Sequence, residues 1–204
     1  TEIYALREKN GFLHPETCTR EALIATYKDF APYFDVKFKK RLGRLRFVDF
    51  NQGVDARLFS RRIVKLLAEI RPLRIAFDNI KTEPEYTKAL TMSEEYGMKD
   101  FSNYLLYNFT DKPEELYHRM RINVDLCENL NVSIYSFPMK YHPITGEHSH
   151  DRDYIGKYWN RKYIRAVQAI LNATKGKIGR GVSFFEKAFG RNEREYMELL
   201  IMPE

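Results

Sequence analysis

Carboxylate and amide side chains gather where short apolar runs of this sequence end. Asp49, Asn51 and Gln52 close the run that contains Val48 and Phe50, just before Gly53. Three later runs end in the same way, with these residues: Asp78 and Asn79 after RIAF, Asn108 after YLLY, and Lys140 after SFPM. A buried carboxylate or amide without a hydrogen-bond partner costs several kcal/mol. Polar groups at four run ends therefore indicate a shared ligand site rather than unrelated structural contacts.

The elements that must position these groups repeat along the chain. The runs have these bounds: 46–51, 74–79, 104–108 and 132–138, and their last residues lie 28, 29 and 30 positions apart. Between them are segments with helical periodicity, over residues 58–70, 84–97 and 113–130. Strands that alternate with helices at this spacing predict βα units and a parallel sheet.

The pattern extends to the N-terminal part of the chain and stops before the C-terminal part. Thr1–Asn10 predicts one more strand and Glu16–Phe30 its helix, so that about five βα-type strands are expected. Five strands are too few for an eight-stranded barrel and agree with a partial (β/α) TIM-like barrel or an open sheet. After Tyr141 the rhythm stops, and residues 154–174 predict an amphipathic helix, followed by short helices at 183–190 and 193–201. We expect an α/β barrel body over residues 1–145 and a helical C-terminal extension over residues 146–204.

The carboxyl ends of the strands are the expected binding edge, because ligands of parallel βα folds lie where the strand-to-helix loops gather. Period-two alternation directs Asp49 and Asn51 inward while Val48 and Phe50 pack against helices. The next strand follows the same rule, with these positions: Arg74, Ala76 and Asp78 inward, Ile75 and Phe77 outward.

Three local signals complete this picture. Gly53 is expected to let the chain pass close to a ligand. Asp55 is typical of the N-cap of a helix that starts at Ala56. Asp111, before Pro113, is typical of the N-cap of the helix that follows.

Composition restricts the class of protein. The 204 residues are 44% hydrophobic and 30% charged, a balance typical of soluble globular domains. No apolar run approaches the ~20 residues that span a bilayer, and no signal-peptide pattern is present. Cys18 and Cys127 are too few for a disulfide framework, so a reducing cytoplasm is the expected location. The net charge of +6 is unevenly spread, with a basic run at Val36–Arg46 that could bind nucleic acid or another anion, or lie solvated at the surface.

Four segments resemble the radical S-adenosylmethionine (radical SAM) superfamily, in particular its uncharacterised bacterial and archaeal members. They are FNQGVDAR (50–57), RIAFDN (74–79), NYLLYNFTDKPEEL (103–116) and SIYSFPMKYHP (133–143). In the third and fourth segments, YNFTDKPEEL resembles the fifth-strand turn of the family, and SFPMKYHP resembles its sixth strand. The resemblance covers about residues 1–145, and residues 155–176 resemble the extension of that subgroup.

The resemblance implies a partial (β/α)6 barrel that holds S-adenosylmethionine and a [4Fe–4S] cluster. In that family, electron transfer from the cluster cleaves the sulfonium and produces a 5′-deoxyadenosyl radical that abstracts hydrogen from the substrate. The cofactors perform the difficult chemistry, and the protein binds and shields them. The implied partners are an electron donor and a substrate of unknown identity, for which the basic run slightly favours an anion, including a nucleic acid.

The family's functional positions can be carried over residue by residue. Asp49 and Asn51 match the third-strand acid and amide near the aminocarboxylate or ribose of S-adenosylmethionine, and Gln52 and Gly53 follow them. The other carried-over positions are these: Asp78 and Asn79 at a ribose-contacting strand end, Asn108 at the turn that faces adenine, and Lys140 and Arg57 as candidate partners of an anion or the substrate.

One part of the family pattern is absent. The cluster-binding CxxxCxxC does not occur in the 204 residues, and Cys18 and Cys127 cannot replace three closely spaced thiolates. In the family that motif follows the first strand, which would precede Thr1. We therefore expect a C-terminal portion of a longer enzyme or a degenerate homologue, inactive by itself in radical chemistry.

Three other interpretations stay open. The first is a nucleic-acid-binding module that uses residues 37–46 and binds more weakly as salt rises. The second is a non-radical (β/α)-barrel enzyme in which Asp49 and Asp78 act as acid and base. The third is that the two histidines and two aspartates of the loop Gly146–Asp153 bind a metal. Segments of this composition are more often hydrophilic surface loops.

Overall fold

The computed structural model describes Ala5, Glu8, Lys9 and residues 48–68, 70–178 and 181–201. The chain divides into two compact units, Thr1–Val48 and Asp49–Glu204. The predicted helix at residues 16–30, the basic run at 36–46 and Cys18 lie outside the described residues. The three described residues of the first predicted strand are helical, which agrees with the strong helix propensity of alanine, glutamate and lysine.

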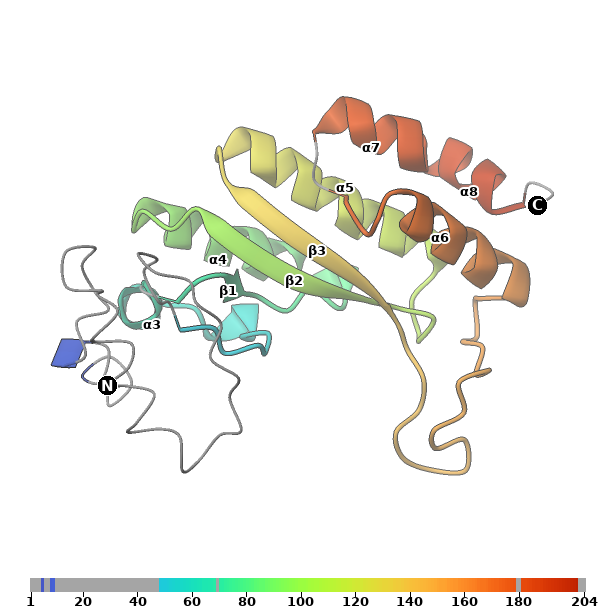
Figure 1. Cartoon of the computed structure of the whole chain (residues 1–204), viewed down its shortest axis with the longest axis horizontal. Coiled ribbons are helices and arrows are strands. Elements are labelled where there is room, and N and C mark those ends of the chain that lie inside the picture. Colours follow the sequence, from blue (N-terminus) through green and yellow to red (C-terminus); the bar gives the residue numbers. More distant parts are fainter. Residues whose placement is uncertain (1–4, 6–7, 10–47, 69, 179–180, 202–204) are drawn as a thin grey trace, which may run out of the picture. The chain divides into compact units, whose positions relative to one another are not determined.

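A parallel sheet forms the centre of the second unit (Figure 1). Its strands are β1 (Leu73–Arg74), β2 (Asp100–Tyr107) and β3 (Ser133–Lys140), in that spatial order. In this register Arg74 lies beside Ser102, and Ser102 lies beside Tyr135. The mixed α/β class and the parallel pairing predicted from the sequence are confirmed.

A further segment joins the sheet at Val54. Val54 forms a parallel bridge with Ile75, its N–H donates to the Arg74 carbonyl at 2.8 Å, and its own carbonyl accepts from the Ala76 N–H at 2.9 Å. Three residues after the predicted strand end at Asn51, the chain therefore runs parallel to β1 and the residues that continue it to Asp78, which together are called the β1 segment.

The predicted packing of the preceding run is wrong at Phe50. This ring is 47% exposed instead of packed against a helix. Asp49 Oδ1 accepts the Asn51 N–H at 2.8 Å, and Asn51 has a φ of 52°. The backbone turns at this point because an aspartate that bonds two residues ahead favours a turn over an extended strand.

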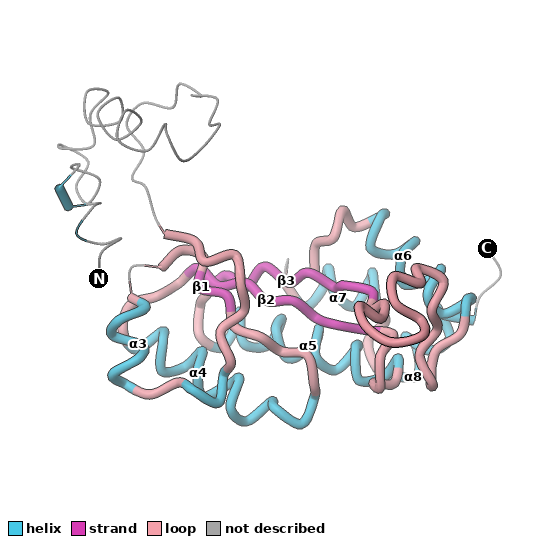
Figure 2. Tube along the Cα trace, turned by 90° about the horizontal axis from the view of Figure 1, so that it is seen from below, coloured by secondary structure: helices cyan, strands magenta, loops and turns pink. Residues whose placement is uncertain are grey.

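Helices α3 (Arg61–Leu67), α4 (Glu83–Glu95) and α5 (Pro113–Asn129) follow the strand segments, close to their predicted positions. The 3-10 turns η1 (Ala56–Leu58) and η2 (Ile80–Thr82) precede α3 and α4. Figure 2 shows α4 and α5 on the same side of the strands. The Phe77 ring stacks on Tyr86 of α4 with centroids 4.2 Å apart, which joins the end of the β1 segment to that helix.

The two faces of the sheet differ in exposure. Ile75 and Phe77 are at most 1% exposed on the helix side, as the alternation predicts, and Leu105 is fully buried there as well. Tyr135 and Phe137 on the other face are 45% and 37% exposed. The face predicted to point inward is therefore open in this unit.

Buried amides tie the sheet to its two covering helices. Asn103 Nδ2 on β2 donates to the Tyr86 hydroxyl at 2.7 Å, and that hydroxyl donates to Asn123 Oδ1 at 2.8 Å. Asn123 Nδ2 on α5 donates to Ser136 Oγ on β3 at 2.9 Å. Such paired groups fix how α4, α5 and the strands meet, because each would be costly if left alone.

The C-terminal part contains α6 (Arg161–Ala173), α7 (Val182–Phe189) and α8 (Glu193–Ile201). The helix predicted from residue 154 begins later, because Asn160 Oδ1 accepts the Tyr163 N–H at 2.8 Å and caps α6. Helix α8 contacts α5 and α6 and contributes buried Tyr196 and Leu200 to the core. Within the described ranges, none of the helices has the length and apolarity needed to cross a membrane.

Candidate functional site

A pocket of about 420 Å³ lies where the Val54 segment meets the end of the β1 segment. Its lining includes four of the predicted site residues: Gly53, Arg57, Asp78 and Asn79. Asp55 also lines it. The structure thus unites polar groups from the carboxyl ends of two neighbouring strand segments, as the sequence predicts.

Asp49 is held by a cation on the open face of the sheet. The guanidinium of Arg74 donates to its carboxylate at 2.8 Å and 3.1 Å, and it also donates to Ser102 Oγ at 2.9 Å. The hydrogen bonds from Arg74 hold the pKa of Asp49 below its ordinary value. Arg74 lies on the face opposite Ile75, as the alternation predicts, and its pairing with Asp49 is an interaction that strand alternation alone does not reveal.

Gly53 permits a close approach between two backbone segments. A Cβ at this position would lie 3.2 Å from the Cβ of Ala76 and 3.3 Å from its backbone nitrogen. The sequence predicted that this glycine makes room for a ligand. In the structure, it makes room for the adjacent strand segment at Ala76. Gln52, next to it, is exposed.

Asp55 and Arg57 form a fork at the rim of the pocket. The predicted cap is confirmed, because Asp55 Oδ1 accepts the Arg57 N–H at 3.0 Å at the start of η1. The Arg57 guanidinium donates hydrogen bonds to both carboxylate oxygens of Asp55, from Nε to Oδ1 at 2.9 Å and from Nη2 to Oδ2 at 2.6 Å. These hydrogen bonds lower the pKa of Asp55 to about 2. The pair is exposed, so Arg57 can exchange Asp55 for another anion at little cost.

Asp78 and Asn79 occupy the other wall. Asn79 Oδ1 accepts the Lys81 N–H at 2.9 Å and so begins η2. Asp78 is exposed as a residue, but its carboxyl group is partly enclosed by protein. This loss of hydration raises the pKa of Asp78, and the positive charge of Arg119 opposes the rise without cancelling it. Asp78 is therefore the carboxyl of this pocket whose proton affinity is increased.

Asn108 lies elsewhere and holds a loop. Its side chain is fully buried, Nδ2 donates to the carbonyls of Tyr141 and Tyr154 at 3.1 Å and 3.0 Å, and Oδ1 accepts the Gly156 N–H at 2.9 Å. All the polar atoms of this side chain thus bond to backbone groups. A contact between Asn108 and adenine would have to come from its backbone.

Lys140 lies at the end of β3 and lines two different pockets, neither of which includes Asp78 or Asn79. Its Nζ donates to the Arg152 carbonyl. The structure therefore does not bring Lys140 together with the pocket at Gly53.

Arg119 is a buried cation that sequence patterns did not single out. Its guanidinium donates to Asp111 Oδ2 at 2.9 Å and to the carbonyls of Phe77 and Asp78 at 3.3 Å and 3.1 Å. The predicted N-cap at Asp111 is wrong: α5 is capped at Lys112, whose N–H donates to Glu115 at 2.9 Å. The available signal was an arginine among the apolar residues of α5, at Leu116, Tyr117 and Met120.

No group of three or more histidine, cysteine, aspartate or glutamate side chains that could hold a metal ion occurs in the described part of the chain. This part includes the loop Gly146–Asp153 and Cys127. No family model matches the chain, and neither a curated protein nor a solved structure matches it.

Proposed function

We propose that the chain is the part of a radical SAM barrel that contacts S-adenosylmethionine, and that the pocket at Gly53 binds this molecule. The observation that carries the proposal is the pocket itself, which joins Gly53, Asp78 and Asn79 at adjacent strand ends. The parallel strands, with helices on one face and an open polar and aromatic face on the other, agree with a segment of a partial (β/α)6 barrel.

The residues of the pocket fit the polar groups of S-adenosylmethionine. The Asp78 carboxylate can accept hydrogen bonds from ribose hydroxyls, and the Asn79 amide offers both a donor and an acceptor. Arg57, whose present partner Asp55 is exposed, can pair with the methionine carboxylate. Gly53 leaves this wall without a side chain.

The [4Fe–4S] cluster is not matched by the described residues, because no three thiolates or other ligands converge there. An electron delivered through such a cluster, from an electron donor, is what would cleave S-adenosylmethionine in this family. We derive no radical step for these residues, and the proposal concerns binding of S-adenosylmethionine alone.

Isothermal titration of the whole chain with S-adenosylmethionine tests the proposal. We expect saturable binding, weakened about tenfold or more by Asp78→Asn, because a hydrogen bond to a charged group contributes about 1.5–3 kcal/mol. Asp125→Asn is the matched control, since Asp125 is a surface carboxylate of α5 that pairs with Arg121. Absence of binding at millimolar ligand by a chain with unchanged circular dichroism would exclude the proposal, as would equal weakening by both variants.

A non-radical barrel enzyme is the second candidate. In such an enzyme, Asp49, whose pKa is lowered by Arg74, would act as the base, and Asp78, whose pKa is raised by burial, would act as the acid. It predicts turnover by the isolated chain without iron or S-adenosylmethionine, lost in Asp78→Asn. Turnover that persists in this variant would contradict the assignment.

A further inference from the structure

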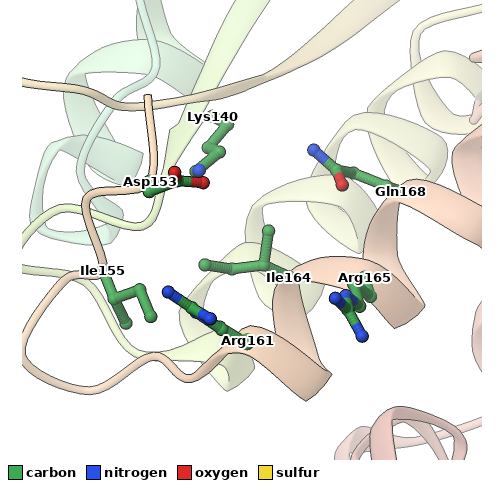
Figure 3. A pocket seen from close by; sticks show the side chains of 7 residues that line it. All are labelled: Lys140, Asp153, Ile155, Arg161, Ile164, Arg165 and Gln168. Atoms are coloured by element: carbon green, nitrogen blue, oxygen red, sulfur yellow. The ribbon is translucent and has the colours of Figure 1, made fainter. Parts of the chain in front are cut away.

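A groove runs between the end of β3 and helix α6. Two adjoining hollows of about 220 and 480 Å³ form it, and Lys140 and Gln168 line both of them. Figure 3 shows Lys140 and Asp153 across from the α6 side chains of Arg161, Arg165 and Gln168. The groove shares no lining residue with the pocket at Gly53, so the inference below does not rest on the proposed function.

Positive charge dominates the groove. Lys140, Arg161, Arg165 and Lys175 line it, and Asp153 is the carboxylate on its wall. Residues 154–185 contain seven lysines and arginines and no aspartate or glutamate. Over the described ranges, neither Arg161 nor Arg165 forms an ion pair. These cations are therefore available to an external anion.

The polar side chains of α6 follow one face of the helix. Arg161, Arg165, Gln168 and Asn172 recur at intervals of four, three and four residues, which places them in a single line. At 1.5 Å per residue this line is about 16 Å long. Since stacked nucleotides rise 3.4 Å each, it matches the length of about five nucleotides. A linear polyanion therefore fits this face better than a single phosphate.

Exposed aromatic rings form the other wall of the groove. Tyr135 and Phe137 of β3 line the larger hollow, with ring centroids 4.4 Å apart and exposed fractions of 45% and 37%. They alternate along the strand and so lie on the same face of the sheet. Exposed aromatics on a sheet beside a positively charged groove are the combination that holds unpaired bases and their phosphates.

We propose that this groove binds single-stranded nucleic acid, with phosphates against Lys140, Arg161 and Arg165 and bases stacked on Tyr135 and Phe137. Charge complementarity identifies the occupant as a polyanion, and the aromatic rings identify it as one with unpaired bases. A duplex lacks free base faces for these rings, so it binds more weakly than a single strand of the same length.

Fluorescence anisotropy with a labelled twelve-nucleotide oligouridylate or oligothymidylate tests this on the whole chain. The variant Lys140→Gln/Arg161→Gln/Arg165→Gln is expected to weaken binding about tenfold or more in low salt. The slope of log affinity against log salt becomes shallower by about 2, because each phosphate contact of a single strand contributes about 0.7. Phe137→Leu weakens binding about fivefold with the salt slope unchanged, because only stacking is lost.

Matched controls separate this groove from general charge effects. Lys187→Gln/Arg191→Gln/Arg194→Gln removes the same charge from α7, α8 and the turn between them, where Arg191 and Arg194 pair with glutamates, and is expected to bind like the wild type. The proposal is overturned if the groove variant binds like the wild type. It is also overturned if only neutralisation of residues 37–46 abolishes binding, or if a duplex or a mononucleotide competes as well as the single strand.

Discussion

Replacing Arg119 by methionine would remove the cation that joins the end of the β1 segment to α5. The side chain is fully buried, and it pairs with Asp111, which is only 8% exposed. Besides that carboxylate, it donates to the carbonyls of Phe77, Asp78 and Glu115 at 3.1–3.3 Å. Asp111 keeps two other donors, the Phe109 N–H at 3.0 Å and Trp159 Nε1–H at 3.3 Å.

The expected loss of stability follows from the unpaired charge of Asp111 that the substitution leaves in the interior. Removing one partner of a buried ion pair costs about 3–5 kcal/mol, because the other charge stays in the interior unpaired. This is a large fraction of the 5–15 kcal/mol by which domains are typically stable. Adding Asp111→Asn to Arg119→Met removes that charge and keeps an acceptor for Phe109 and Trp159. We therefore expect the double variant to be more stable than Arg119→Met by about 1 kcal/mol or more.

The effect depends on pH in a defined direction. Burial raises the pKa of Asp111, the Phe109 N–H and Arg119 act against this, and loss of Arg119 raises it further. A carboxyl with a raised pKa in the folded state destabilises the fold above that pKa, and the cost disappears below its unfolded value of about 4. The stability deficit of Arg119→Met is thus largest at neutral pH and narrows in acid. The deficit of the double variant narrows less, because Asp78 is then the nearby carboxyl that has lost the charge of Arg119.

Urea unfolding followed by far-ultraviolet circular dichroism measures these differences. With a slope of about 2 kcal/mol per molar urea, the expected loss lowers the midpoint by about 1.5–2.5 M. Arg119→Lys, which keeps the charge but not the planar fork, should lie between the wild type and Arg119→Met. A midpoint shift below about 0.5 M for Arg119→Met, or a double variant no more stable than the single one, would refute the reasoning.

Three further predictions concern the hydrogen bonds that Asn108 forms with the 141–156 loop, the tight packing at Gly156, and the Asp49–Arg74 ion pair. Asn108→Ala removes three hydrogen bonds to the backbone, so it should cost about 1–3 kcal/mol and speed hydrogen exchange at the Gly156 amide; unchanged exchange would contradict the clamp. Gly156→Ala would place a Cβ 2.6 Å from the Phe109 carbonyl oxygen, so a loss of about 1–3 kcal/mol and a fall in Tm of several degrees are expected in thermal unfolding. Asp49→Asn should cost less than about 1 kcal/mol at neutral pH, because the Arg74 pair is partly exposed. Since the folded pKa of Asp49 is lowered, this contribution is present above its ordinary pKa and is lost as pH falls through the lowered value, so urea midpoints of variant and wild type should converge in strong acid.

Much of the secondary structure could be predicted because its causes are local. The buried strand residues Ile75 and Phe77 alternate with Arg74, Ala76 and Asp78, and Asp55 caps the turn that begins at the next residue. Such signals act over a few positions and survive in the linear sequence. The prediction failed at Phe50, where the side chain of Asp49 bonds to the backbone two residues ahead and turns the chain out of its strand.

The candidate site was predictable only in part. The strand-end rule places Gly53, Asp78 and Asn79 together, and the structure unites them in one pocket. The rule does not predict which distant residues a polar side chain at a strand end will contact. Asn108 bonds to carbonyls 33 and 46 residues away, and Lys140 faces a helix that begins 21 residues later.

The alternation of strands and helices, the parallel sheet and the polar character of the strand ends could be predicted from the residues alone, because periodicity and capping depend on near neighbours. Which polar residues share a pocket depends on how the elements pack. The tertiary structure paired Asp49 with Arg74, buried Arg119 against Asp111 and gathered the cations of α6 beside the aromatic rings of β3. These pairings are decided by packing, because a polar group takes its partner from the residues that the fold brings near, whether that partner lies 8 residues away, as for Arg119 and Asp111, or 25, as for Asp49 and Arg74.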